Sequence, residues 1–191
     1  MNGWVAGTEP YAWPYDGRLH GHHLALVLAG WDEGWRGRAG PTADAPVAQR
    51  TLQLAAAVAA HGGLVVAVAH GSAHLSLAVP HRVANAAGLD GFFGGPLDHL
   101  LRAEGRTHLL VAGHGIEGPV HSTLRAANDR GYECLLVVDA CTALVADLAP
   151  AAAKTVTMSG GIFGAVGTVA AVLDAVAPTD RPTPSPTAQE A

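Results

Sequence analysis

Residues 111–123, VAGHGIEGPVHST, are the part of the sequence that decides the fold, because they predict a buried strand that turns sharply into a helix. Residues 108–112 form a short apolar run typical of a strand, and residues 113–118 supply a glycine-rich turn. The helix is predicted over residues 119–130, since proline is tolerated in a first helical turn and Gly131 is a typical helix end. This arrangement has the form of a nucleophile elbow, with Pro119 where the nucleophile would lie.

The rest of the chain alternates apolar runs with helical patterns, which predicts an α/β fold. We expect a three-layer sandwich whose central sheet is mostly parallel and covered on both faces. Strands are expected at residues 23–29, 64–69, 82–84, 108–112, 134–138 and 162–166. Helices are expected at residues 46–61, 96–104, 119–130 and 169–177, with another after the fifth strand that is interrupted at Pro150.

Length and composition predict one compact domain. The chain has 191 residues, of which 49% are hydrophobic and 14% charged, enough for a single buried core. We expect an N-terminal arm over residues 1–22, the domain over residues 23–177, and a disordered tail over residues 178–191, which is rich in proline and threonine.

Charge and cysteine content exclude several classes of partner. The formal net charge is −5 and no basic cluster occurs, so neither a nucleic acid nor a membrane is an expected partner. No signal peptide or membrane-spanning segment is visible in the sequence. Two cysteines predict a reducing compartment without a disulfide framework, and we expect a cytoplasmic protein.

Four further segments accompany the elbow in a compatible order: YAWPYDG at residues 11–17, LALVLAGWDEGW at 24–35, RAANDRGYECLLVVDACTA at 125–143 and KTVTMSGGIFGAV at 154–166. Together they resemble the isochorismatase-like cysteine hydrolases, most closely the biuret amidohydrolase branch. The resemblance covers residues 11–176 and implies the Rossmann-like sandwich of that family, with its last strand in the fourth segment. It also implies a homo-oligomer, either a dimer or a tetramer.

The resembling enzymes use an aspartate, a lysine and a cysteine, and none of the three is retained here. LVLAGW places Ala29 where the aspartate is expected, and GIEGPV places Pro119 at the cysteine. The lysine falls near Ala86, if the pair at residues 91–92 is aligned with the family's small residue and phenylalanine. These residues offer no thiol, carboxylate or ammonium, and proline lacks the N–H that helps to bind an oxyanion. Cysteine-dependent hydrolysis is therefore not expected.

Other departures from the branch concern the substrate pocket. The segment between the second strand and residue 96 is much shorter than in the biuret hydrolases, which predicts a less covered pocket. Ser159 stands where that branch has a glutamine, so a substrate amide contact is lost. The expected pocket residues are Trp31, Asp32, Phe92, Asp139 and Ser159. Cys134 and Cys141 occupy positions that the branch also fills with cysteine, and both are expected to be part of the scaffold.

Ionisable side chains gather where the predicted strands end, the edge at which open α/β sheets bind ligands. His70 follows the second strand, and His114, Glu117 and His121 surround the elbow. These four are the candidate acid and base groups. His70 and His74 also resemble a two-histidine metal segment of nicotinamidases, and His81 could be a third ligand, but the accompanying aspartate falls on Val68. No cofactor is therefore assigned.

Two functional hypotheses remain open. The first is a repurposed, non-hydrolytic enzyme that transforms a small metabolite by acid/base chemistry, such as a cyclisation, elimination or isomerisation, in a biosynthetic context. The second is a pseudoenzyme that serves as a ligand-binding or structural subunit. Such a subunit would assemble with itself or with an active paralogue.

Overall fold

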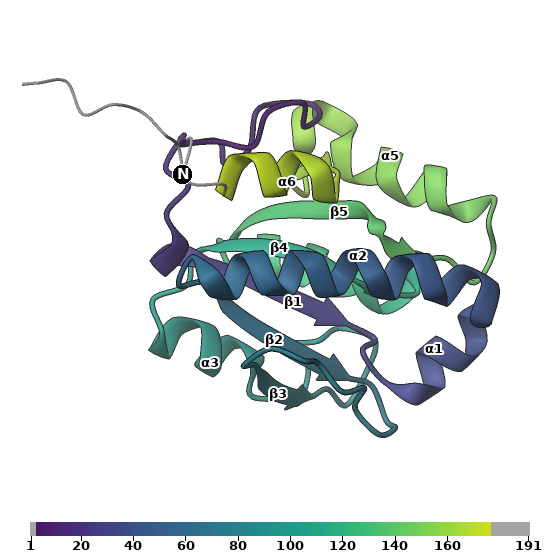
Figure 1. Cartoon of the computed structure of the whole chain (residues 1–191). Helices are drawn as coiled ribbons and strands as arrows, with labels where there is room; N and C mark the ends of the chain where they lie inside the picture. Colours follow the sequence, from purple (N-terminus) through teal and green to yellow (C-terminus); the bar gives the residue numbers. More distant parts are fainter. Residues whose placement is uncertain (1–2, 177–191) are drawn as a thin grey trace, which may run out of the picture.

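The computed structural model describes residues 3–176, and the predicted tail lies outside them. Its centre is a six-stranded sheet in the order β3-β2-β1-β4-β5-β6, with every strand parallel to its neighbours (Figure 1). The strands are β1 (Leu24–Ala29), β2 (Leu64–Ala69), β3 (Arg82–Asn85), β4 (His108–His114), β5 (Glu133–Thr142) and β6 (Ala165–Gly167). The predicted α/β fold with a parallel sheet is confirmed.

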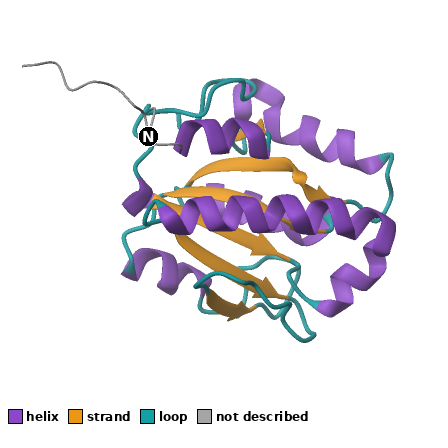
Figure 2. Ribbon diagram, viewed as in Figure 1, coloured by secondary structure: helices purple, strands orange, loops and turns teal. Residues whose placement is uncertain are grey.

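Helices cover both faces of this sheet (Figure 2). The helices are α1 (Glu33–Ala39), α2 (Pro41–Ala60), α3 (Leu97–Ala103), α4 (His121–Asp129), α5 (Leu148–Gly161) and α6 (Val169–Val176), with single turns at Gly21–His23 and Ile116–Val120. The first core contains apolar residues of α2 and α6, and the second contains those of α3, α4 and α5. No helix among residues 3–176 has the length and apolar character needed to cross a bilayer.

The central strands are buried on both faces, which explains why they appear in the sequence as continuous apolar runs. Successive side chains of a strand point to opposite faces. Leu26 and Leu28 therefore pack in the α2/α6 core, whereas Val27 and Ala29 pack in the α3/α4/α5 core. Each fully buried leucine or valine contributes about 1.5–3 kcal/mol relative to an exposed one. The two cores fix the carboxyl ends of the strands, where the elbow lies.

Three helices differ from the prediction. Helix α1 was not expected, because the polar residues after β1 were interpreted as pocket residues; the Asp32 side chain caps it instead. Helix α2 begins at Pro41 rather than Pro46, and Pro46 lies inside the helix. Helix α5 is not interrupted at Pro150, because it begins at Leu148 and the proline therefore lies in its first turn, where no N–H bond is lost.

The ends of three strands also differ from the prediction. β4 continues beyond Ala112 to His114, and β5 continues through Asp139 to Thr142. A register shift between β4 and β5 lies at Val111/Gly113, so the longer end of β5 is accommodated by an irregularity in the pairing. The last strand is short and begins at Ala165, because residues 154–157 continue the helix and Met158, Ser159 and Gly160 then form a kink with non-helical backbone angles.

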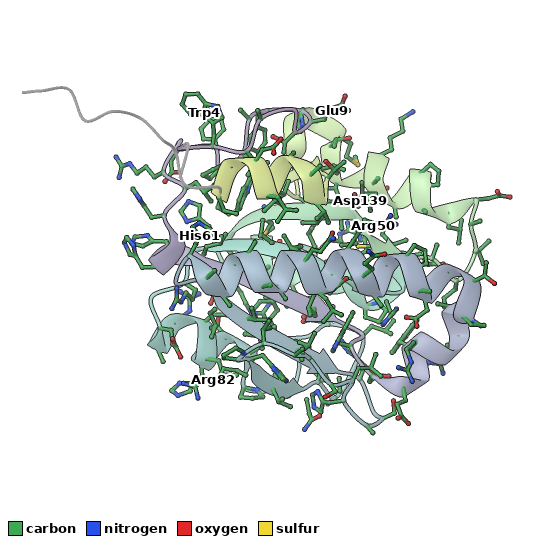
Figure 3. The ribbon with its side chains drawn as sticks, in the orientation of Figure 1. Trp4, Glu9, Arg50, His61, Arg82 and Asp139 are labelled. Carbon is green, nitrogen blue, oxygen red and sulfur yellow. The ribbon has the colours of Figure 1, made fainter. Side chains whose placement is uncertain are left out.

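The N-terminal segment is attached closely to the domain. Val5 and Trp13 are fully buried in the α2/α6 core and pair with each other in an antiparallel bridge. Glu9, which is labelled in Figure 3, pairs with Val166 of the edge strand β6 through two backbone hydrogen bonds of 2.9 and 2.7 Å. These residues therefore extend the sheet and its core.

Candidate functional site

The elbow follows β4 directly. Gly115 has a φ of 77°, the next five residues form a wide turn in which Gly118 has non-helical backbone angles, and α4 starts at His121. Trp35 of α1 covers this turn, since a β-carbon on Gly115 would lie 2.8 Å from its ring and one on Gly118 would lie 3.1 Å from it. A side chain at position 115 would thus overlap Trp35, whereas one at position 118 would require the Trp35 ring to shift by a few tenths of an ångström.

The three positions that the resemblance aligns with catalytic residues are buried and apolar. Ala29 is fully buried, Ala86 is 8% exposed and Pro119 is buried at the elbow. Ala29 and Ala86 belong to the same core as Ile116 and Phe92. These three residues are therefore part of the hydrophobic core or its edge at the elbow.

Phe92, an expected pocket residue, is part of this core. It is 6% exposed, and its ring stacks on Tyr132 with a centroid distance of 5.9 Å. Arg130 lies over the same ring at 4.6 Å. These packing contacts are enough to explain the position of the Phe92 side chain.

Asp32, a second expected pocket residue, is fully buried and organises the start of α1. Its carboxylate accepts hydrogen bonds from the Trp35 N–H at 3.0 Å, the His70 N–H at 2.8 Å and the Ser72 hydroxyl at 2.7 Å. Burial on its own raises the pKa of Asp32, but these hydrogen bonds outweigh it and the pKa is lowered. The carboxylate is consequently ionised and bound to protein donors on both oxygens.

Two imidazoles after β2 are oriented by neighbouring oxygens. His70 Nδ1 lies 2.7 Å from the Gly88 carbonyl oxygen, and His74 Nε2 lies 2.9 Å from Asn85 Oδ1. Each contacted nitrogen therefore donates, which leaves a lone pair on His70 Nε2 and on His74 Nδ1. Both of these atoms are buried and without a hydrogen-bond partner in the described part of the chain.

The third candidate ligand does not join them. His81 Nδ1 lies 2.8 Å from the Val79 carbonyl oxygen. Within residues 3–176, no three histidine, cysteine, aspartate or glutamate side chains are close enough together to bind a metal ion. His70, His74 and His81 therefore do not form a three-ligand centre.

His114 lies on the face of the sheet opposite Ala29. It follows Leu110 and Ala112 of the α2/α6 core at the strand period of two, and its ring stacks on Trp31 with a centroid distance of 5.1 Å. Its Nδ1 lies 3.2 Å from the Thr142 hydroxyl, and its Nε2 lies 3.6 Å from Asp44 Oδ1. Burial lowers the pKa of His114, an effect that the nearby Asp44 carboxylate partly opposes. The imidazole is therefore neutral at neutral pH.

The buried state of His114 predicts a pH dependence of stability. The unfolded chain protonates this histidine near pH 6.5, whereas the folded state keeps it neutral to lower pH. The free energy of unfolding should therefore decrease as the pH falls from about 6.5 towards the folded pKa, by up to about 1.4 kcal/mol per pH unit. Urea unfolding between about pH 5 and 7 should show a smaller slope for His114→Gln than for the unmodified protein. The exposed His99→Gln variant should keep the full slope, and an unchanged slope in His114→Gln would contradict the assignment.

Glu117 and His121 lie on the elbow side. Glu117 Oε1 accepts hydrogen bonds from the N–H groups of Leu144 at 2.8 Å and Val145 at 2.9 Å, so it holds the loop after β5. His121 packs edge-on against Phe163 at 6.3 Å, and burial lowers its pKa. Glu117 is therefore engaged in a structural contact, as His114 is on the other face.

Asp139 and Ser159 are not brought together. Asp139 Oδ1 accepts a hydrogen bond of 2.8 Å from the Val169 N–H at the start of α6, and its carbonyl accepts one of 2.5 Å from Arg50 Nε of α2. Figure 3 shows Arg50 and Asp139 next to each other between these helices. Ser159 is exposed near the end of α5, with a φ of 53°.

Neither cysteine is activated as a nucleophile. Cys134 is buried within β5, and burial raises the pKa of its thiol well above the usual range. Burial also raises the pKa of Cys141 to about 12. Because the thiolate is the nucleophilic form, neither residue is activated for attack.

The sequence did not point to Trp35, Arg36 or Asp44, although all three contribute to this end of the sheet. The sequence does carry a signal for the start of α1. Asp32 is a typical N-cap residue, and the acidic Glu33 follows it in what would be the first helical turn. Recognising α1 would have placed Trp35 one turn from the cap and hence near the elbow.

Comparisons with known proteins agree with this architecture. A crystal structure of a cysteine hydrolase from Pseudomonas syringae pv. phaseolicola 1448A superposes with a TM-score of 0.72 at 17% identity, covering 83% of this chain and 94% of that one. A nicotinamidase from Staphylococcus aureus gives a TM-score of 0.68 at 16% identity, covering 77% and 99%. An isochorismatase family protein from Burkholderia thailandensis gives 0.68 at 23% identity, covering 81% and 96%. The isochorismatase domain profile matches residues 25–171. The chain therefore belongs to the isochorismatase family.

Proposed function

We propose that this chain is a non-hydrolytic member of the isochorismatase family, related to the biuret amidohydrolase branch, which binds a small metabolite without cleaving it. The observation that carries the proposal is the apolar burial of Ala29, Ala86 and Pro119. A hydrolase of this family needs ionisable groups at these positions, and here they are core residues. In this proposal the protein functions as a binding subunit, as a homo-oligomer or together with an active paralogue.

The contacts of the acid and base candidates favour binding over turnover. Glu117 Oε1 is occupied by two backbone N–H groups, and His114 is fully buried on the opposite face from Ala29. A catalytic acid or base has to reach the proton that it transfers within hydrogen-bond distance. These two residues are not positioned to act together on one substrate at the elbow.

A repurposed acid/base enzyme is the second candidate, and one observation favours it. His70 Nε2 carries a lone pair and has no hydrogen-bond partner within residues 3–176, while Nδ1 is fixed on the Gly88 carbonyl. This is the arrangement expected of an oriented general base. Once a substrate is identified, His70→Gln should lower its turnover about a hundredfold or more if this second candidate is correct, and the exposed His20→Gln variant serves as the matched control.

The proposal predicts no hydrolysis of biuret, nicotinamide, ureidoacrylate or isochorismate by the purified protein. Pro119→Cys alone should not restore activity, because Ala29 and Ala86 leave the new thiol without a group that lowers its pKa. Product formation is measured by liquid chromatography, with an intact family hydrolase as the positive control. Turnover by the unmodified protein that a thiol-alkylating reagent abolishes would overturn the proposal.

A further inference from the structure

The surface around α5 is apolar and carries little charge. Between residues 140 and 173 the only charged side chains are those of Asp147 and Lys154. Exposed apolar side chains that gather in one region mark sites where proteins associate, and the centres of such sites are depleted of charge. Five of the eleven large apolar side chains that are exposed among residues 3–176 belong to this region: Leu144, Val145, Leu148, Met158 and Ile162.

The outer side of α5 carries two opposite charges with a small residue between them. The helix packs on β5 and β6 with Ala152 and Val156 buried, and its other side lies at the periphery of the fold (Figure 1). Asp147, Ala151 and Lys154 are all exposed, and their spacings of four and three residues place them in one line along the helix. Ala151, which has only a methyl side chain, therefore separates a negative from a positive charge.

Neither charge is neutralised within residues 3–176. Asp147 is the N-cap residue of α5, but its side chain forms no hydrogen bond to the helix. Neither Asp147 nor Lys154 takes part in a salt bridge there. The two residues lie seven positions apart, about 10 Å along the helix axis, which is too far for them to pair with each other. Both charges are thus available to another molecule.

We propose that a second copy of this chain docks on α5, with the two α5 helices antiparallel about a two-fold axis that passes next to Ala151. The midpoint between Asp147 and Lys154 falls at this axis. Each Asp147 then lies opposite Lys154 of the second copy, and the axis forms this pair twice. An isologous interface requires such self-complementarity, whereas a different protein would not need opposite charges at equal distances from the centre. The symmetry of the charges therefore favours a second copy as the occupant.

The same arrangement brings exposed apolar side chains together. In the register of the two charge pairs, Leu144 and Val145 lie near Met158 of the second copy, and all three are 38–51% exposed in the single chain. Glu117 holds Leu144 and Val145 in place before association, because its Oε1 accepts their backbone N–H groups. A contact that is ordered in the free protein loses less entropy on binding. With only a methyl group at Ala151, the two helices can approach each other closely.

The interface is expected to be small and the dimer reversible. The regular part of α5 ends before Met158, where the backbone angles become non-helical, so about three helical turns are available from each copy. Such an area lies at the lower end of the range for specific complexes. The proposal names the contact surface of the homo-oligomer in the proposed function and rests on that part of it alone. It does not depend on the loss of hydrolysis.

The test is sedimentation-equilibrium centrifugation of the full chain from about 1 to 500 μM. We expect a monomer–dimer equilibrium with a dissociation constant of about 100 μM, the strength of a small, reversible interface. Asp147→Lys and Lys154→Asp should each weaken the dimer at least about tenfold, because each turns both attractive pairs into repulsive ones. Glu33→Lys is the matched control, since it also reverses an exposed acidic residue at the start of a helix, α1, and it should leave the equilibrium unchanged.

Two combinations separate charge pairing from misfolding. The double variant with Asp147→Lys and Lys154→Asp restores opposite charges across the axis and should dimerise within about threefold of the unmodified chain. An equimolar mixture of the two single variants should form a heterodimer at least about tenfold more stable than either homodimer, because every facing pair is then opposite. Circular dichroism confirms that each variant is folded.

The proposal is overturned if the unmodified chain remains monomeric at about 500 μM, if both reversals leave the dimer unchanged, or if the folded double variant stays monomeric. A dimer insensitive to both reversals would keep the homo-oligomer of the proposed function and place its interface on another face. A chain that is monomeric alone and binds only an active paralogue would also overturn the proposal. Hydrolysis assays on the same protein report separately on the rest of the proposed function.

Discussion

Replacing Asp32 by alanine is expected to lower the free energy of unfolding by about 2–4 kcal/mol. The change removes the N-cap of α1, which is worth about 1 kcal/mol. It also leaves the His70 N–H without its acceptor, at about 1–3 kcal/mol, whereas the hydroxyl of the exposed Ser72 can bond to water instead. Urea unfolding monitored by circular dichroism gives the difference directly.

Asp147 provides the matched control for Asp32. It is also the N-cap residue of a helix, α5, but its side chain forms no capping hydrogen bond. Asp147→Ala should therefore change stability by less than about 0.5 kcal/mol. The pKa of Asp32 is lowered in the folded protein, so its stabilising effect should be present at neutral pH and decline as the pH falls through that pKa. Equal losses for the two variants would show that the buried hydrogen bonds of Asp32 contribute little.

Gly113→Ala is expected to cost more than about 4 kcal/mol, or to prevent folding. Gly113 has a φ of 128°, outside the range of an alanine, and an added β-carbon would overlap the backbone carbonyl of Ala29 in the paired strand. Relief would require β1 and β4 to separate at the centre of the sheet. The measurement is the yield of folded protein and, where it folds, its urea midpoint.

Gly131→Ala is the control that measures the cost of a positive φ without any steric overlap. Gly131 also has a positive φ, of 83°, but an added β-carbon would meet no atom within 4 Å. This change should cost only about 1–2 kcal/mol. If Gly113→Ala were as stable as Gly131→Ala, the close approach of β1 and β4 would be refuted.

The sheet could be predicted from the sequence because buried parallel strands leave a simple pattern. β2 was predicted with its observed ends, and β1 within one residue, since each is a continuous apolar run followed by polar residues. The end of β4 could not be predicted in the same way, because Gly113 and Gly115 imply a turn, although only Gly115 begins one. The extension of β5 depends on an irregularity in its pairing with β4, which local sequence does not encode.

The candidate site was less predictable, because position at the end of a strand does not determine the face to which a side chain points. His114 and Glu117 are three residues apart in the sequence, but His114 packs under Trp31 and Glu117 holds the loop after β5. Asp32 was expected to contact a ligand, and all three of its hydrogen bonds are made to the protein. The burial of Ala29 and Pro119 was easier to anticipate, because both belong to the apolar strand and elbow that the sequence predicts.

The pairing of Glu9 with Val166 also bears on self-association. An exposed edge strand presents free N–H and C=O groups to which another molecule can add a strand, and this is a common route to aggregation. At β6 both backbone groups of Val166 are already bonded to Glu9 of the same chain. A second molecule could add to this edge at Val166 only after displacing the segment that carries Glu9. That segment is anchored by the fully buried side chains of Val5 and Trp13 on either side of it, so the protein carries its own protection against strand exchange there.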